Sequence, residues 1–233
     1  MSVLRVSLVC AAASLLVLVG AAAPTPAERA AALLARMSLS DKVAMLHGGD
    51  GPGGYTGSVA ANAALGIPAL TLNDGRQGFR PNDGNRGETA FPCELAVAAT
   101  FDTALFRAFG AAMGAEFKGK GANVVLAPML ILARVPQSGR TFESCGEDPE
   151  LAYAFAKAHI EGVQSVPGVI ANADDYVLNN QELARGSISA VADERTRFEI
   201  YYRAYAGAIA GGVGSFMCSC AMMRKCWYSS PRR

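Results

Sequence analysis

A short apolar run followed by a polar loop and a capped helix is the feature that most constrains how this chain can fold. The run is NVVLAPML (Asn123–Leu130), and the loop after it contains GRTFESCGEDP (Gly139–Pro149). The Asp-Pro pair that closes this loop supplies an N-cap and a proline suited to the first helical position. A strand, a polar loop and a helix in this order form the βα unit of a barrel, whose loop lies at the C-terminal end of the strand. We therefore expect Arg140 and Glu143 at such a mouth, where they either hold the hydroxyls of a polar, uncharged ligand or form a structural ion pair.

Apolar runs alternate with helical patterns along the rest of the chain. Three more runs are bounded by Gly or Pro, as buried parallel strands are: Ala69–Leu72, Val169–Ala171 extending toward Leu178, and Val213–Cys218. Helices are predicted over Ala27–Met37, Asp41–Leu46, Thr103–Phe117 and Pro149–Val163, and from Asp193 onward. This alternation predicts an α/β fold with a parallel sheet.

The helix predicted from Asp193 carries a stripe of large apolar side chains. The stripe consists of Phe198, Tyr201, Tyr202, Tyr205 and Ile209. We expect it to pack against the sheet as core rather than to form a stacking platform for a sugar.

Residues 1–22 have the pattern of a signal peptide. Arg5 supplies a basic segment, Val6–Val19 is apolar, and Gly20–Ala23 offers small residues for cleavage. The apolar segment is short for a membrane span. We expect cleavage after Ala22 and a secreted, extracellular chain that has no membrane association, with an uncleaved anchor as the alternative.

The charges of the chain are balanced. It has 21 Lys and Arg against 20 Asp and Glu. Nothing in this balance indicates the basic face of a nucleic-acid-binding protein, so no nucleic-acid partner is expected.

The cysteines indicate a free thiol rather than a metal site. Cys10 would leave with the signal peptide, and five would remain: Cys93, Cys145, Cys218, Cys220 and Cys226. An odd number in an oxidising compartment leaves at least one thiol unpaired or paired between chains. The spacings fit no zinc pattern, so we predict no metal.

Seven segments follow one another along the chain: LTLNDGRQGFR (Leu70–Arg80), TAFPCELAVAATFD (Thr89–Asp102), GAEFKGKGANVVLAPM (Gly114–Met129), GRTFESCGEDPEL (Gly139–Leu151), YVLNNQE (Tyr176–Glu182), DERTRFEIYYRAY (Asp193–Tyr205) and GSFMCS (Gly214–Ser219). In this order they resemble those of family-3 glycoside hydrolases, which include β-glucosidases and β-xylosidases. The resemblance implies a (β/α)8 TIM-type barrel. Because only four strands are predicted, we expect a partial barrel of about the first four βα units, over residues 23–219.

The last residues depart from the family pattern. Residues 220–233, CAMMRKCWYSSPRR, contain the only Trp and no acid. We expect an aberrant tail that reflects an error in the gene model, such as a frameshift or a retained intron, or else a genuinely shortened protein.

The resemblance implies the chemistry of an exo-acting β-glucosidase, a two-step retaining hydrolysis without a cofactor. Retaining enzymes use a carboxylate nucleophile and a carboxyl acid/base. In the family the nucleophile is an Asp on a later strand and the acid/base is usually a Glu of a following domain, so both would lie beyond the end of this chain. We expect no catalytic residue in the chain and an inactive fragment. The alternatives are a non-catalytic sugar-binding remnant, a β-xylosidase, and a chain with no folded function.

Three residues match family positions that hold the non-reducing sugar of a β-glucoside or oligosaccharide substrate. Asp74 matches an Asp that accepts hydrogen bonds from glucose hydroxyls, Arg140 matches an Arg that donates to the same sugar, and Met217 matches an apolar contact. The alternative roles are a turn residue for Asp74 and ordinary core for Met217.

Two positions depart from the family. Asp174-Asp175 stands where the family has a Lys-His pair that grips the sugar, and Cys220 stands where glucosidases usually have a pocket Tyr. Since adjacent strand residues point to opposite faces, we expect only one of the two acids to face the barrel interior. We also expect the acids to impair hydrolysis until Lys-His is restored.

Overall fold

The computed structural model describes residues 23–49, 54–80 and 87–220. Contacts divide the chain into two compact units, and the boundary in the sequence lies between Leu46 and His47. The predicted signal peptide lies outside the described residues, as does the predicted tail except for Cys220. Cys93, Cys145, Cys218 and Cys220 are free thiols. No helix in the described ranges is long and apolar enough to cross a membrane.

The described residues of the first unit form two short helices, α2 (Pro26–Arg36) and α3 (Leu39–Ala44). Each begins with a capping box, in which the side chains of Thr25 and Ser38 accept from the backbone three residues on. The two helices predicted in this region are confirmed, with bounds shifted by one to two residues.

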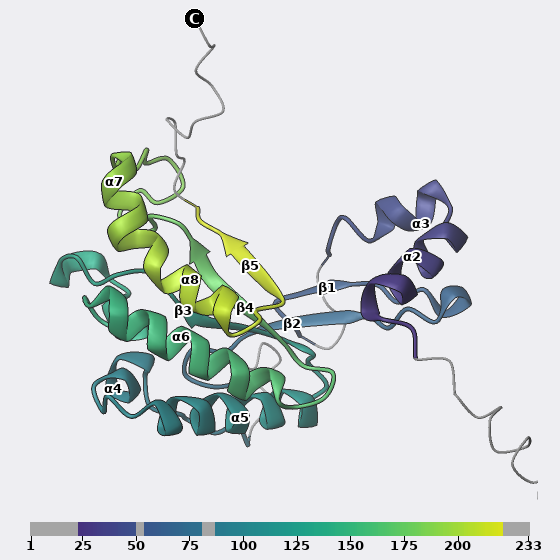
Figure 1. Ribbon diagram of the computed structural model, residues 1–233, viewed down its shortest axis with the longest axis horizontal. Coiled ribbons are helices and arrows are strands. Elements are labelled where there is room, and N and C mark those ends of the chain that lie inside the picture. Colours follow the sequence, from purple (N-terminus) through teal and green to yellow (C-terminus); the bar gives the residue numbers. More distant parts are fainter. Residues whose placement is uncertain (1–22, 50–53, 81–86, 221–233) are drawn as a thin grey trace, which may run out of the picture. The chain divides into compact units, whose positions relative to one another are not determined.

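The second unit is built on one five-stranded sheet with the strands in chain order (Figure 1). The strands are β1 (Gly57–Val59), β2 (Leu70–Asp74), β3 (Val124–Met129), β4 (Ile170–Tyr176) and β5 (Ser215–Cys218). Strands β2 to β5 run parallel, and β1 pairs antiparallel with β2. The four predicted strands are confirmed. The three-residue β1 is additional, and it is too short to give a clear apolar pattern.

Helices connect the parallel strands. They are α4 (Glu94–Ala98), α5 (Thr103–Gly119), α6 (Pro149–Gln164), α7 (Glu194–Thr196) and α8 (Tyr202–Ala210), with short 3-10 turns at Ala63–Leu65, Pro136–Ser138 and Thr141–Glu143. Helix α6 packs between α5 and α8, as Figure 1 shows. Every residue of β3 is buried, as expected for a central strand of a parallel sheet.

Glycines let these helices approach each other closely. A Cβ atom on Gly162 of α6 would overlap the carbonyl oxygen of Arg107 in α5, and one on Gly207 of α8 would overlap that of Tyr153 in α6. The helices therefore touch backbone to backbone at these points, where only the smallest residue fits.

We expect Gly162→Ala to lower the free energy of unfolding by about 2 kcal/mol or more, because overpacking a tight contact forces the backbone apart. Chemical denaturation measures the effect. Gly119→Ala is the matched control, since a Cβ at Gly119 meets nothing within 4 Å. Equal stabilities of the two variants would contradict the proposed helix contact.

The predicted packing of the aromatic stripe is confirmed for Tyr201, Tyr202 and Tyr205, which are in or against the core, and wrong for Phe198 and Ile209. Asp193 caps α7 as predicted, but residues Arg197–Tyr201 form a π-helical segment before α8. A π-helix has a wider turn than an α-helix, so the residues in it and after it leave the face predicted from a period of 3.6. Phe198 is 64% exposed and Ile209 is 67% exposed, whereas Tyr205 is buried.

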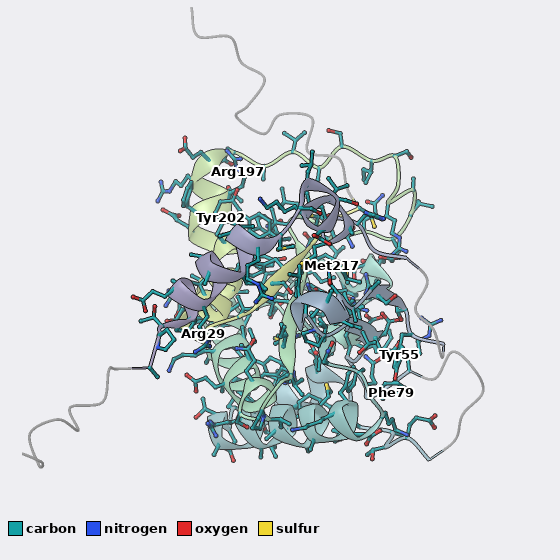
Figure 2. The ribbon with its side chains drawn as sticks, turned by 90° about the vertical axis from the view of Figure 1, so that its right-hand side faces the viewer. Arg29, Tyr55, Phe79, Arg197, Tyr202 and Met217 are labelled. Carbon is teal, nitrogen blue, oxygen red and sulfur yellow. The ribbon has the colours of Figure 1, made fainter. Side chains whose placement is uncertain are left out.

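Aromatic side chains from the segments that flank β1 and β2 pack against the core. Figure 2 labels Tyr55 and Phe79, whose ring centroids lie 6.4 Å apart. Phe79 in turn packs edge-on against Phe117 of α5 at 5.1 Å. Deeper in the helix layer, the buried His159 stacks on Phe155 with 5.4 Å between ring centroids.

Candidate sugar-binding site

The loop between β3 and α6 folds back onto the strand that it follows. Ser144 forms a parallel bridge with Met129, the last residue of β3. The loop ends at Asp148, whose side chain accepts from the backbone N–H of Glu150 at 2.8 Å and caps α6. Arg140 and Glu143 are therefore held near the C-terminal end of β3, as predicted.

Arg140 is surrounded by carboxylates. Its Nη2 donates to Oε2 of Glu143 at 2.8 Å, and its Nη1 donates to Oδ2 of Asp175 at 3.0 Å. The same Nη1 lies 3.6 Å from Oε1 of Glu182. Burial by itself would lower the pKa of Arg140, but the hydrogen bond to Glu143 and the three negative charges raise it above its usual value. The guanidinium is thus permanently charged.

Sequence reasoning missed a second arginine. Arg76 lies in the loop just after β2, and its Nη1 is 3.2 Å from Oε2 of Glu143, the oxygen that Arg140 also contacts. The Nη2 of Arg76 pairs with Asp174 on β4. The sequence offered one signal for Arg76, its position two residues after the predicted site residue Asp74.

We call the connected group of charged side chains the arginine network. Its members are Arg76, Arg140, Glu143, Asp174, Asp175 and Glu182.

The expectation that only one acid of Asp174-Asp175 faces the site is wrong. Asp174 contacts Arg76 and Asp175 contacts Arg140, so both carboxylates enter the same network. The cause is an irregular register: Ala173 pairs with Phe216, but Tyr176 already pairs with Cys218. Three steps along β4 match two along β5, and such an extra residue breaks the alternation of side chains.

The two acids are deeply buried. Asp174 has no exposed surface, and Asp175 is 3% exposed. Burial raises the pKa of Asp174 to about 7, an effect that Arg76 opposes and the neighbouring Asp175 reinforces. Asp175 also accepts from Nδ2 of Asn179 at 2.7 Å.

A third buried acid was also missed. Glu94 begins α4, is completely buried, and its Oε2 accepts the backbone N–H of Met129 at 2.9 Å. Burial raises the pKa of Glu94 well above its usual range, while Arg76 acts in the opposite direction. A single Glu in an apolar segment gave no signal in the sequence, which did not predict α4.

The other two predicted site residues lie on β2 and β5. Asp74 is the last residue of β2, and its Oδ2 accepts from Nη1 of Arg80 at 2.8 Å. Its carboxylate remains partly exposed, at 24%. Met217, labelled in Figure 2, is half-buried on β5. Asp74 and Arg140 belong to neighbouring strand ends, but their roles toward a sugar, like that of Met217, stay predictions.

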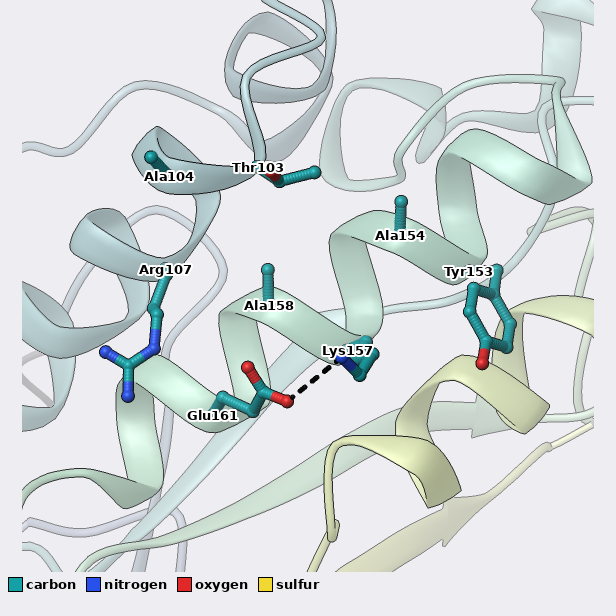
Figure 3. A pocket seen from close by; sticks show the side chains of 8 residues that line it. All are labelled: Thr103, Ala104, Arg107, Tyr153, Ala154, Lys157, Ala158 and Glu161. Carbon is teal, nitrogen blue, oxygen red and sulfur yellow. Dashed lines mark ion pairs between the residues drawn. The ribbon is translucent and has the colours of Figure 1, made fainter.

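A separate groove of about 440 Å³ lies between α5 and α6 (Figure 3). It is lined by Thr103, Ala104, Arg107, Tyr153, Ala154, Lys157, Ala158 and Glu161. Lys157 and Glu161 form an ion pair at 3.4 Å. No member of the arginine network lines this groove, so it belongs to the helix layer and not to the strand ends.

The parallel sheet, with its polar loops after the strands, defines the first part of a TIM-type α/β barrel. The sequence profile "Glycosyl hydrolase family 3 N terminal domain" matches residues 55–227. The chain therefore belongs to glycoside hydrolase family 3. The resemblance seen in the sequence and the prediction of a partial TIM-type barrel are both confirmed.

Curated relatives and solved structures agree with this assignment. The chain is 39% identical to "Beta-glucosidase cel3A" of Pyricularia oryzae over 196 residues, which are 83% of this chain and 26% of that protein. It is 38% identical to a β-glucosidase of Rhizobium radiobacter, over 80% of this chain and 23% of that protein. Among solved structures, DesR of Streptomyces venezuelae, a β-glucosidase in complex with D-glucose, matches with a TM-score of 0.80 and 36% identity. That match covers 84% of this chain and 25% of DesR. The chain spans about a quarter of the length of these relatives.

Proposed function

We propose that this chain forms the part of a β-glucosidase that holds the terminal glucosyl residue of the substrate. The observation that carries the proposal is the position of Arg140 in the loop after β3, one strand away from Asp74 at the end of β2. In a parallel barrel the strand ends on this side form the active site. The choice of glucose as the sugar is supported by similar proteins, because DesR and β-glucosidase 3B of Thermotoga neapolitana are both described in complex with glucose.

The two groups offer complementary hydrogen bonding to a sugar. The carboxylate of Asp74 accepts hydrogen bonds, and it is partly exposed. Arg140 has five N–H donors, and its side-chain hydrogen bonds to described residues use one on each Nη. Neutral hydroxyls suit this pair because each hydroxyl both donates and accepts.

Bond cleavage requires more than this pair. A retaining glycosidase places two carboxyl groups about 5–5.5 Å apart across the scissile bond. The carboxylates of the arginine network are engaged by arginine, and so we assign them to the shaping of the site. A non-catalytic sugar-binding role is the second candidate, and these occupied carboxylates favour it. Hydrolysis of an aryl β-glucoside by this chain would exclude the non-catalytic role. We expect no hydrolysis, because the buried carboxylates near the strand ends are paired with Arg76 and Arg140.

We expect Asp74→Ala to weaken glucose binding more than Glu143→Ala. Asp74 would make charge-assisted hydrogen bonds to the ligand, each worth roughly 1.5–3 kcal/mol, whereas Glu143 positions the arginines. Isothermal calorimetry with glucose measures both, and xylose tests the β-xylosidase alternative. Glu161→Ala, on the surface of α6, is the control. An equal or larger loss at Glu143 would reverse the two roles, and no binding of glucose by the unaltered chain would refute the proposed function.

A further inference from the structure

Arg76 connects three parts of the site that are distant in the sequence. It lies after β2, its Nη1 reaches Glu143 in the loop after β3, and its Nη2 reaches Asp174 on β4. Its side chain is only 12% exposed. An arginine in this environment has lost most of its hydration, so its position is determined by the carboxylates that it contacts.

Glu143 is the point at which the two arginines meet. Its Oε2 lies 3.2 Å from Nη1 of Arg76 and 2.8 Å from Nη2 of Arg140. One carboxylate oxygen between two guanidinium groups is held from both sides. If either arginine is removed, the Glu143 carboxylate can move together with the arginine that remains.

We infer that Arg76 is a positioning residue, which fixes Glu143 and through it the orientation of Arg140 toward the bound sugar. Asp174 anchors Arg76 on β4, as Asp175 anchors Arg140. The contacts thus form two parallel links from β4 to Glu143. The functional consequence rests on the proposed binding of sugar by Arg140, but the linkage between the two arginines does not.

This arrangement gives the Asp174-Asp175 pair a structural role, because each acid is the partner of one arginine. Asp174 is the anionic partner of Arg76, so the charges at positions 76 and 174 have to be opposite. A Lys at position 174 would place a second cation against Arg76 in a buried site, where like charges repel strongly. Restoring the Lys-His pair of the family should therefore fail in this chain unless Arg76 is replaced as well.

The first test is a double-mutant cycle on stability, with the full chain and the variants Arg76→Met and Arg140→Met. If Arg76 fixes the carboxylate that Arg140 contacts, the decreases in melting temperature of the two single variants are not additive. The double variant then melts at a higher temperature than the sum of the two decreases predicts. Arg195→Met is the control, since Arg195 is exposed and pairs with Glu199 on the surface. Additive losses for Arg76 and Arg140 would overturn the inference whether or not glucose binds.

The second test is the dissociation constant for glucose, measured by calorimetry. We expect Arg76→Met to raise it about tenfold, which corresponds to about 1.4 kcal/mol. Arg76→Lys should recover only part of this loss, because Lys lacks the fork that holds two carboxylates. Asp174→Asn, which keeps the shape of the side chain, should act like Arg76→Met. If these variants bind glucose as the unaltered chain does, Arg76 is not a positioning residue and the proposed function still stands. If the unaltered chain binds no glucose, the proposed function fails and the stability cycle decides on Arg76.

Discussion

Replacing Arg140 with Met should lower the free energy of unfolding by about 3 kcal/mol, because it leaves buried carboxylates without their cation. Glu143 and Asp175 both lose a hydrogen-bonded partner, and Asp175 lies almost entirely out of contact with water. Met fills a similar volume, so the effect reports the lost charge and not a cavity. Urea denaturation at pH 7 measures the change.

The surface pair of Arg195 and Glu199 provides the comparison. Its atoms lie 2.9 Å apart, but the Arg195 side chain is 83% exposed. Exposed pairs contribute little, so Arg195→Met should cost no more than about 0.5 kcal/mol. A similar cost for both replacements would show that solvent reaches the arginine network freely.

Replacing His159 with Phe should remove a large part of the acid sensitivity of the fold. Burial lowers the pKa of His159 to about 3, from about 6.5 for an unfolded chain. Neither ring nitrogen has a hydrogen-bond partner among the described residues. The folded state therefore binds this proton less readily than the unfolded state, and stability is lost as the pH falls from 6.5 toward 3. One pKa unit corresponds to 1.36 kcal/mol, so the loss at pH 5 is about 2 kcal/mol.

Unfolding free energies at pH 7.5 and pH 5 test this expectation. The difference between the two pH values should shrink by about 2 kcal/mol in His159→Phe. His159→Leu is a second variant in case the larger ring strains the helix layer. His47, the other histidine of the chain, is exposed and serves as the control. A pH dependence that is unchanged in both His159 variants would mean that the imidazole is accessible to water when the chain is folded.

The sequence predicted the strands and the principal helices because their signals are local. The run from Val124 to Leu130 is continuously apolar, and the Asp-Pro pair before α6 marks a helix start by its own chemistry. Arg140 and Glu143 were predicted together because they are three residues apart in one loop. The partner of Asp174 could not be predicted in this way, since Arg76 is 98 residues away and the pair depends on the irregular register of β4.

Other features depended on geometry that no local pattern encodes. The π-helical segment from Arg197 to Tyr201 rotates the following helix, so the aromatic stripe divides between core and surface. Glu94 becomes a buried acid because α4 begins next to Met129, whose backbone N–H donates to the Glu94 carboxylate. In both cases the tertiary contact, and not the intrinsic preference of the residue, decides the outcome.

The extra residue in β4 has a consequence for redesign of the site. In a regular strand, a designer who varies one position changes one face and leaves the next residue to the opposite side. Here Asp174 and Asp175 are neighbours in the chain and also members of the same charged network. Two successive codons therefore encode one wall of the site, and a library that varies either codon alone samples mostly mismatched charges. Productive variants should be found where both codons, together with that of Arg76, are varied at once.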